Sequence, residues 1–145
     1  EWEFKLGAEN EIFWKVAMEI QEDVLLEMQQ ANIMLYSGYK FWHAGESNKG
    51  KFSEDYTEDY DILPFRDWNG EASYGISALG PNLPTVFFVN HHPDKRLGAI
   101  IENTDSLYKA RLLQYYKINT QVMLPGQVNY FSGIIRVNPI KNKKS

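Results

Sequence analysis

The chain has 145 residues, 43% of them apolar and 14% aromatic, which suits one folded domain with one core and excludes a disordered chain. Residues 1–75 carry sixteen acidic and six basic side chains, whereas residues 76–145 carry three acidic and nine basic ones; the two halves can attract each other, or one face can attract a basic partner. The absence of cysteine excludes disulfides, thiolate catalysis and zinc sites made of cysteine.

The first predicted element is a long amphipathic helix from about Glu9 to Tyr36, because apolar residues recur there at spacings of three and four. Glu9 and Asn10 suit its N-terminus, and Gly38 suits its end. We expect the apolar stripe to pack on the core, with a coiled-coil seam as the alternative. The stripe consists of Phe13, Val16, Ala17, Ile20, Val24, Met28, Ala31 and Leu35.

A long connecting region is predicted over residues 38–84, which are rich in glycine, asparagine, serine and acids and have weak hydrophobic periodicity. Short strands are predicted at Tyr36–Trp42 and Ala72–Ile76. Connections of this length are packed on the domain or functional, so the aromatic residues of this region are candidates for binding a partner or a ligand. These candidates are Trp42, Tyr56, Tyr60 and Trp68.

The second half of the chain is more regular. Thr85–His91 and Arg96–Glu102 are rich in β-branched and aliphatic residues and flank turn residues, which predicts a hairpin. A second helix is predicted over Ser106–Lys117, where Thr104 or Asp105 can cap its first turn.

A second hairpin is predicted from Gln121–Leu124 and Val128–Val137, which flank Pro125 and Gly126. Helix, sheet, helix and sheet in this order predict a single α+β domain over residues 1–145. In that fold the long N-terminal helix and the second helix pack on a mainly antiparallel sheet.

The three histidines are candidates for sensing pH, because an ordinary histidine titrates in mildly acidic surroundings. His91 and His92 lie at the end of a predicted strand, and Asp94 nearby would favour their charged form. His43 is the third candidate. Adjacent strand residues point to opposite faces, so His91 and His92 cannot readily chelate one ion, and we expect no metal and no cofactor.

The acidic residues of the connecting region lack the ligand order of a calcium loop, although they supply paired carboxylates that a small hydrolase could use beside Trp42 or Trp68. No nucleophile elbow, phosphate-binding loop or dinucleotide fingerprint is present. We therefore expect a binding or signalling protein and not an enzyme. The acidic residues are Glu54, Asp55, Glu58, Asp59, Asp61, Asp67 and Glu71.

Direct binding of nucleic acid is not expected, because the basic run of Lys141, Lys143 and Lys144 has no aromatic residues interleaved with it. No stretch of about 18 apolar residues is present, so a membrane anchor would have to precede Glu1. Since the sequence opens at Glu1 without methionine, we expect the soluble part of a longer chain that is anchored at its N-terminus.

The opening stretch EWEFKLGAENEIFWKVAMEIQEDVLLEMQQ, read as the start of a periplasmic domain next to a membrane, resembles the small accessory regulators of enterobacterial fimbrial operons, of the PsaF and MyfF type. The resemblance rests on layout and not on a diagnostic motif. It implies a periplasmic domain, anchored in the inner membrane, that binds and stabilises a membrane-bound transcriptional regulator under acid and temperature control. The alternatives are a structural subunit of a pilus or secretion assembly and a small hydrolase with paired carboxylates.

Overall fold

The structure is a computed structural model that describes residues 1–58, 63–70, 72, 75–91 and 97–140. In these residues it contains eleven strands and no helix, so the fold is all-β and the predicted α+β class is wrong. The strands are β1 (Trp2–Leu6), β2 (Glu11–Ile20), β3 (Val24–Leu35), β4 (Phe41–Ala44), β5 (Asn48–Lys51), β6 (Phe65–Asp67), β7 (Ile76–Leu79), β8 (Thr85–Asn90), β9 (Gly98–Asn103), β10 (Arg111–Met123) and β11 (Gly126–Asn138).

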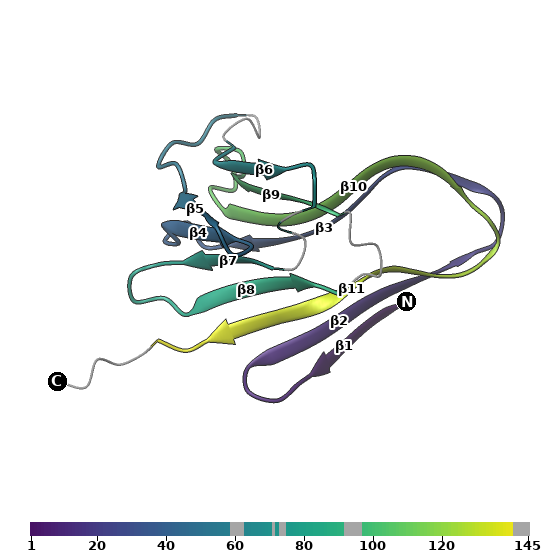
Figure 1. The fold of residues 1–145 in the computed structure, drawn as a ribbon, viewed down its shortest axis with the longest axis horizontal. Helices are drawn as coiled ribbons and strands as arrows, with labels where there is room; N and C mark the ends of the chain where they lie inside the picture. Colours follow the sequence, from purple (N-terminus) through teal and green to yellow (C-terminus); the bar gives the residue numbers. More distant parts are fainter. Residues whose placement is uncertain (59–62, 71, 73–74, 92–96, 141–145) are drawn as a thin grey trace.

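The strands form two antiparallel sheets that pack as a sandwich (Figure 1). The seven-stranded sheet has the order β1-β2-β11-β8-β7-β4-β5, and the four-stranded sheet has the order β3-β10-β9-β6. Strands that follow one another in the chain occupy matching positions: β2 and β3, β11 and β10, β8 and β9, and β7 and β6. Four segments of the chain therefore each contribute one strand to the larger sheet and one to the smaller sheet. β1 and the β4–β5 hairpin extend only the larger sheet.

The predicted helix from Glu9 to Tyr36 is replaced by β2 and β3. Glu9 and Asn10, which the sequence suggested as helix caps, instead adopt positive φ angles of 52° and 70° in the turn between β1 and β2. The apolar residues of β2 and β3 pair with β11 and β10, about one hundred residues away in the chain. Pairing with these distant strands overrides the local helix preference of the Glu-, Gln- and Met-rich segment.

The second predicted helix, Ser106–Lys117, is also absent. Asp105 does accept bonds from the backbone N–H groups of Leu107 and Tyr108, both at 3.0 Å, as a helix cap would. Lys109 then takes a φ of 46°, which ends the turn, and the chain enters β10 at Arg111. The cap predicted from the sequence therefore closes a single turn before a strand.

Two of the predicted strands are confirmed, but both predicted hairpins are wrong. Thr85–Asn90 forms β8 and Val128–Val137 lies within β11. The segment 98–103 is strand β9, yet β9 pairs with β10 and β6 in the other sheet, so β8 and β9 are not a hairpin. In the second predicted hairpin, Gln121–Met123 ends β10 and Val128–Val137 lies in β11, and these two strands belong to different sheets. The short strands expected at 36–42 and 72–76 lie further along the chain, as β4 and β7.

The core fills the space between the two sheets. Tyr115 of β10 is fully buried, and its hydroxyl donates to the backbone carbonyl of Phe88 in β8 at 2.8 Å. Arg111 is buried near one end of the sandwich. It donates to the carbonyls of Tyr39 at 2.9 Å and Ser53 at 2.5 Å. These bonds connect the two sheets and hold the segment after β5 against the domain.

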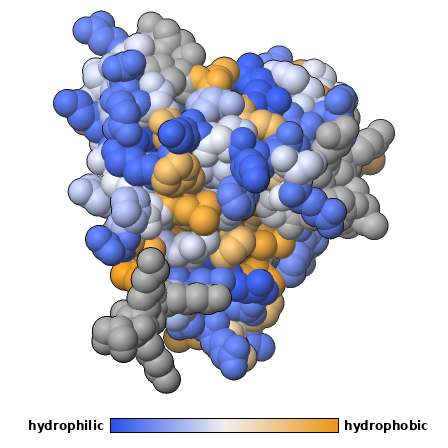
Figure 2. All heavy atoms as spheres, turned by 60° about the vertical axis from the view of Figure 1, so that its left-hand side comes forward, coloured by the Kyte–Doolittle hydropathy of each residue, from blue (hydrophilic) through white to orange (hydrophobic). Residues whose placement is uncertain are grey.

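The surface is mostly hydrophilic, with some exposed apolar side chains. Figure 2 views the end of the sandwich opposite the β2–β3 turn, and apolar side chains gather in the middle of that end with hydrophilic ones around them. Among the described residues there is no helix long and apolar enough to cross a membrane.

At the other end the paired strands β2–β11 and β3–β10 run past the packed sheets, and the chain turns back from β2 to β3 and from β10 to β11 (Figure 1). We name this part, residues 18–28 and 118–128, the arm. It holds four exposed acids and neither lysine nor arginine. The acids are Glu19, Glu22, Asp23 and Glu27, and the largely exposed apolar residues are Val24, Leu25, Met28, Ile118, Val122 and Leu124.

Candidate functional site

The candidate site is a groove between β1 and β3, at one side of the sandwich. The larger sheet ends in β1, which lies one strand beyond β2, while the smaller sheet ends in β3, the counterpart of β2. The inner face of β1 therefore overhangs the edge of the smaller sheet. The groove under it has a volume of about 380 Å³.

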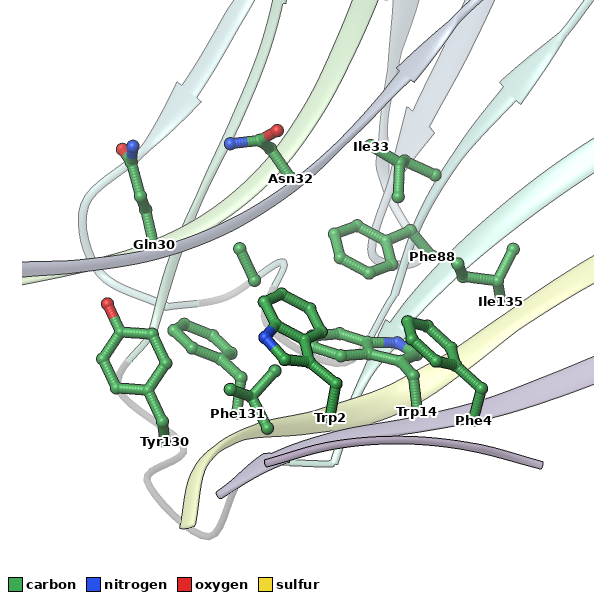
Figure 3. Close-up of a pocket in the computed structure, with 12 residues that line it drawn as sticks. Trp2, Phe4, Trp14, Gln30, Asn32, Ile33, Phe88, Tyr130, Phe131 and Ile135 are labelled. Atoms are coloured by element: carbon green, nitrogen blue, oxygen red, sulfur yellow. The ribbon is translucent and has the colours of Figure 1, made fainter. Parts of the chain in front are cut away.

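Aromatic side chains form its wall and floor (Figure 3). The sequence W-E-F of β1 places Trp2 and Phe4 on one face, because strand residues alternate, and their rings stack 6.1 Å apart. Phe4 lies opposite Trp14 in the register of β1 and β2. Trp14 in turn stacks on Phe88, with ring centroids 5.6 Å apart, so the groove floor is continuous with the core.

A bulge in β11 brings two neighbouring residues into the groove. The register with β2 shifts between Asn129 and Phe131, so Tyr130 is the additional residue. Adjacent residues of a regular strand would point to opposite faces, yet Tyr130 and Phe131 both line the groove, with ring centroids 5.3 Å apart (Figure 3). The bulge thus adds an aromatic ring to the groove without removing one from the core.

Trp14 also supplies a hydrogen-bond donor. Its side chain is 7% exposed, and its indole nitrogen has no hydrogen-bond partner among the described residues. The ring lies across Gly133, where a side chain would press on the backbone carbonyl of Val89. Buried N–H groups in native proteins are normally bonded. This nitrogen has almost no exposed surface, so a ligand in the groove would reach it only if the side chains around it shifted.

The opposite wall is the edge of β3, at residues 30–33. Figure 3 shows the side chains of Gln30 and Asn32 pointing away from the aromatic rings, so these two residues border the groove with their backbone. Ala31 and Ile33 pack toward the core. The wall therefore offers backbone polar groups and two apolar side chains.

No charged side chain occurs among the twelve described residues that line the groove. A charged ligand group would lose its hydration there without gaining a partner, so the groove suits an uncharged ligand with an apolar surface. Exposed fractions of 69% for Trp2 and 64% for Phe4 show that their rings still have surface to offer.

No family model, curated protein or solved structure matches the chain. The groove therefore has to be interpreted from its own geometry.

The two histidine candidates among the described residues, His43 and His91, do not lie together. His43 is exposed on β4, and in register it lies opposite Ser77, which lies opposite Phe87. His91 is exposed four residues after Phe87, roughly 13 Å further along the strand direction. His92 and Asp94 lie outside the described residues.

The aromatic candidates also separate. Trp42 is buried, with its ring centroid 5.0 Å from that of Phe65, so it belongs to the core. Tyr56 is half-buried, with its ring 5.3 Å from the Arg111 guanidinium. Trp68 is half-exposed and makes an edge contact with Tyr116 at 4.8 Å. Tyr60 lies outside the described residues.

The acidic region does not form a metal centre in the part of the chain that the structure describes. Asp67 is buried and uses both carboxylate oxygens to accept the backbone N–H groups of Asn69 at 2.8 Å and Ala72 at 2.7 Å. It therefore shapes a turn. Glu54 bonds the Lys40 ammonium at 2.8 Å on the surface, and this partner lowers the pKa of its carboxyl.

Sequence reasoning missed the residues that form the groove. The alternation W-E-F-K-L in β1 was a readable strand signal. Sequence reasoning also missed Glu102, a buried carboxyl in the apolar strand β9. Burial raises the pKa of Glu102 to about 7, while the nearby charge of Arg66 opposes this shift. A lone acid in the run G-A-I-I-E-N was the available signal.

Proposed function

We propose that this protein is a binding module that holds an uncharged, partly apolar ligand or protein segment in the groove between β1 and β3. The observation that carries the proposal is the aromatic groove, which has no charged side chain among its described lining residues. Aromatic walls with a few placed polar groups are typical of ligand sites.

Binding is favoured over catalysis by the composition of the groove. Acid, base and nucleophilic chemistry needs titratable or nucleophilic side chains in contact with the substrate. The described lining residues contribute aromatic rings, aliphatic groups, amides and one phenol. Such a surface can orient a ligand, whereas it supplies no pair of carboxylates for the hydrolase alternative.

A protein partner remains our proposal for the natural ligand. The resemblance of residues 1–30 to fimbrial accessory regulators implies a membrane-bound transcriptional regulator as the partner, and a periplasmic location. A groove that is open along an edge strand suits a segment of such a partner. Copurification of the regulator with this chain, and its loss with the groove variant described next, would support this assignment.

The groove itself can be tested with Nile red, a neutral dye that fluoresces in apolar surroundings. We expect the dye to brighten with the wild-type chain and to compete with any natural ligand. The double variant Trp2→Ala/Phe4→Ala removes the wall of the groove, and it should weaken dye binding at least tenfold. Both rings are largely exposed, so the variant should keep its fold.

A matched control is Trp68→Ala, which removes a half-exposed aromatic ring directly after β6, the edge strand of the smaller sheet farthest from the groove. This control should bind the dye as the wild type does. Equal dye binding by the wild type and the Trp2→Ala/Phe4→Ala variant would overturn the proposal, because the groove would then not be the site.

A further inference from the structure

The overhang of β1 defines the place of a missing strand. The strands β2, β11, β8 and β7 of the larger sheet correspond to β3, β10, β9 and β6 of the smaller sheet. β1 lies beyond β2 and has no counterpart, so a fifth strand of the smaller sheet would lie beyond β3, opposite β1. No described segment of the chain occupies that position. We propose that this position receives an extended peptide segment, which pairs antiparallel with β3; the inference rests on the groove being the binding site.

The edge of β3 has the groups that such a strand needs. Among the described strands, β3 pairs with β10 alone, over Val24 to Leu35. In an antiparallel edge strand about half of the backbone N–H and C=O groups point away from the partner strand. At residues 30–33 this backbone borders the groove, and the side chains of Gln30 and Asn32 point elsewhere (Figure 3).

The walls determine which side chains the peptide carries. Packed sheets lie about 10 Å apart, so inward side chains of an added strand would contact the rings of Trp2 and Phe4. Ala31 and Ile33 supply the apolar neighbours on β3. Every second residue of the peptide should therefore be apolar, and the residues between them face solvent.

In an antiparallel pairing, the kind found between all the described neighbouring strands, charge fixes which end of the peptide is basic. Glu27 is exposed and lies on the same side of β3 as Ala31, because the two are four residues apart. It belongs to the arm, which holds four exposed acids and neither lysine nor arginine, with Lys117 of β10, opposite Gln29, just outside it. Glu27 lies near the N-terminal end of β3, so the C-terminal end of an antiparallel peptide would lie beside it. A basic residue near the C-terminal end of the peptide therefore complements the charge of Glu27.

Synthetic peptides test the proposal. The first alternates three valines with three threonines and ends in lysine amide. We expect it to displace Nile red and to change the fluorescence of the groove tryptophans. The second has the same sequence with N-methyl groups on alternate backbone nitrogens, which keeps the side chains but removes donors; it should bind at least tenfold more weakly.

The direction is tested by the reversed sequence, which has the same composition with lysine first and should bind at least threefold more weakly at low salt. Glu27→Lys should weaken the first peptide by at least fivefold at low salt, whereas Glu46→Lys, at an exposed acid between β4 and β5, should not.

The outcomes separate this inference from the proposed function. Equal binding of the N-methylated peptide would overturn strand addition. Equal binding of both sequence directions, together with no effect of Glu27→Lys, would overturn the assigned direction. If the dye binds in the groove and no peptide displaces it, the binding function stands and the peptide inference fails. If the dye does not bind there either, both fail.

Discussion

The hydroxyl of Tyr115 in β10 donates a hydrogen bond of 2.8 Å to the backbone carbonyl of Phe88 in β8, and so joins the two sheets beneath the groove. The two rings are also in contact, with centroids 5.1 Å apart. Because Phe88 lines the groove, this bond ties the floor of the binding site to the centre of the smaller sheet.

Replacing Tyr115 with phenylalanine should lower the free energy of unfolding by about 1–2 kcal/mol, since a buried hydrogen bond is lost while the ring remains. Urea denaturation measures the effect. Tyr36→Phe is the control, because the side chain of Tyr36 is mostly exposed and its loss of a hydroxyl should change little. Equal stability of Tyr115→Phe and wild type would show that the bond does not hold the sheets together.

Glu102 should make stability depend on pH. Burial raises its pKa to about 7 in the folded chain, above the unfolded value of 4.5, so the folded state favours the protonated carboxyl. Its contribution to stability is fully present below pH 4.5 and is lost as the pH rises through 7.

Glu102→Gln replaces the carboxyl with a neutral group of similar shape. Relative to this variant, the wild type should lose about 2 kcal/mol of unfolding free energy between pH 5 and pH 8, as measured by urea denaturation. Parallel pH profiles for the two proteins would contradict the prediction.

Arg111 should not tolerate lysine. Its guanidinium donates to Tyr39 and Ser53, as described above, and to the side-chain oxygen of Asn103 at 2.5 Å, while the ring of Phe52 lies 5.0 Å away. One ammonium cannot reach these acceptors from a single point, so Arg111→Lys should cost roughly 2–4 kcal/mol.

The control for this prediction is Arg136→Lys, at the half-exposed surface pair with Glu11. It should cost less than about 1 kcal/mol, because exposed ion pairs contribute little. Thermal unfolding of both variants compares them directly. Similar losses would show that burial of the Arg111 guanidinium has no special role.

Gly133→Ala should disturb both the fold and the groove. The new methyl group would press on the Val89 carbonyl and lie close to the Trp14 indole, so we expect a loss of about 1–3 kcal/mol and weaker Nile red binding. Gly75→Ala is the control, since a Cβ there meets open space. A Gly133→Ala variant as stable as Gly75→Ala would contradict the packing of the groove floor.

Part of the fold could be predicted from local sequence. The strands at Thr85–Asn90 and Val128–Val137 are rich in β-branched and aromatic residues and were predicted. The segment 9–36 was predicted as a helix, because its apolar residues recur at spacings of three and four and its Glu, Gln and Met residues favour helices. Only pairing with β10 and β11 decides in favour of strands, and local patterns do not contain that information.

The site was harder to predict than the strands. The aromatic residues of the connecting region were predicted to bind, but Trp42 packs on Phe65 in the core. The rings of Trp2 and Phe4 become a wall only because β1 overhangs β3, which is a property of sheet order. The inward position of Tyr130 depends on a bulge that no sequence pattern marked.

The matching strand order of the two sheets also constrains how the chain folds during synthesis. β10 and β11 come last in chain order, yet they lie between β3 and β9 in one sheet and between β2 and β8 in the other. Until they leave the ribosome, neither sheet can close, and β3 has no partner strand among those described. The domain should therefore fold only after nearly all of it has been made, with the apolar edge of β3 exposed to chaperones in the meantime.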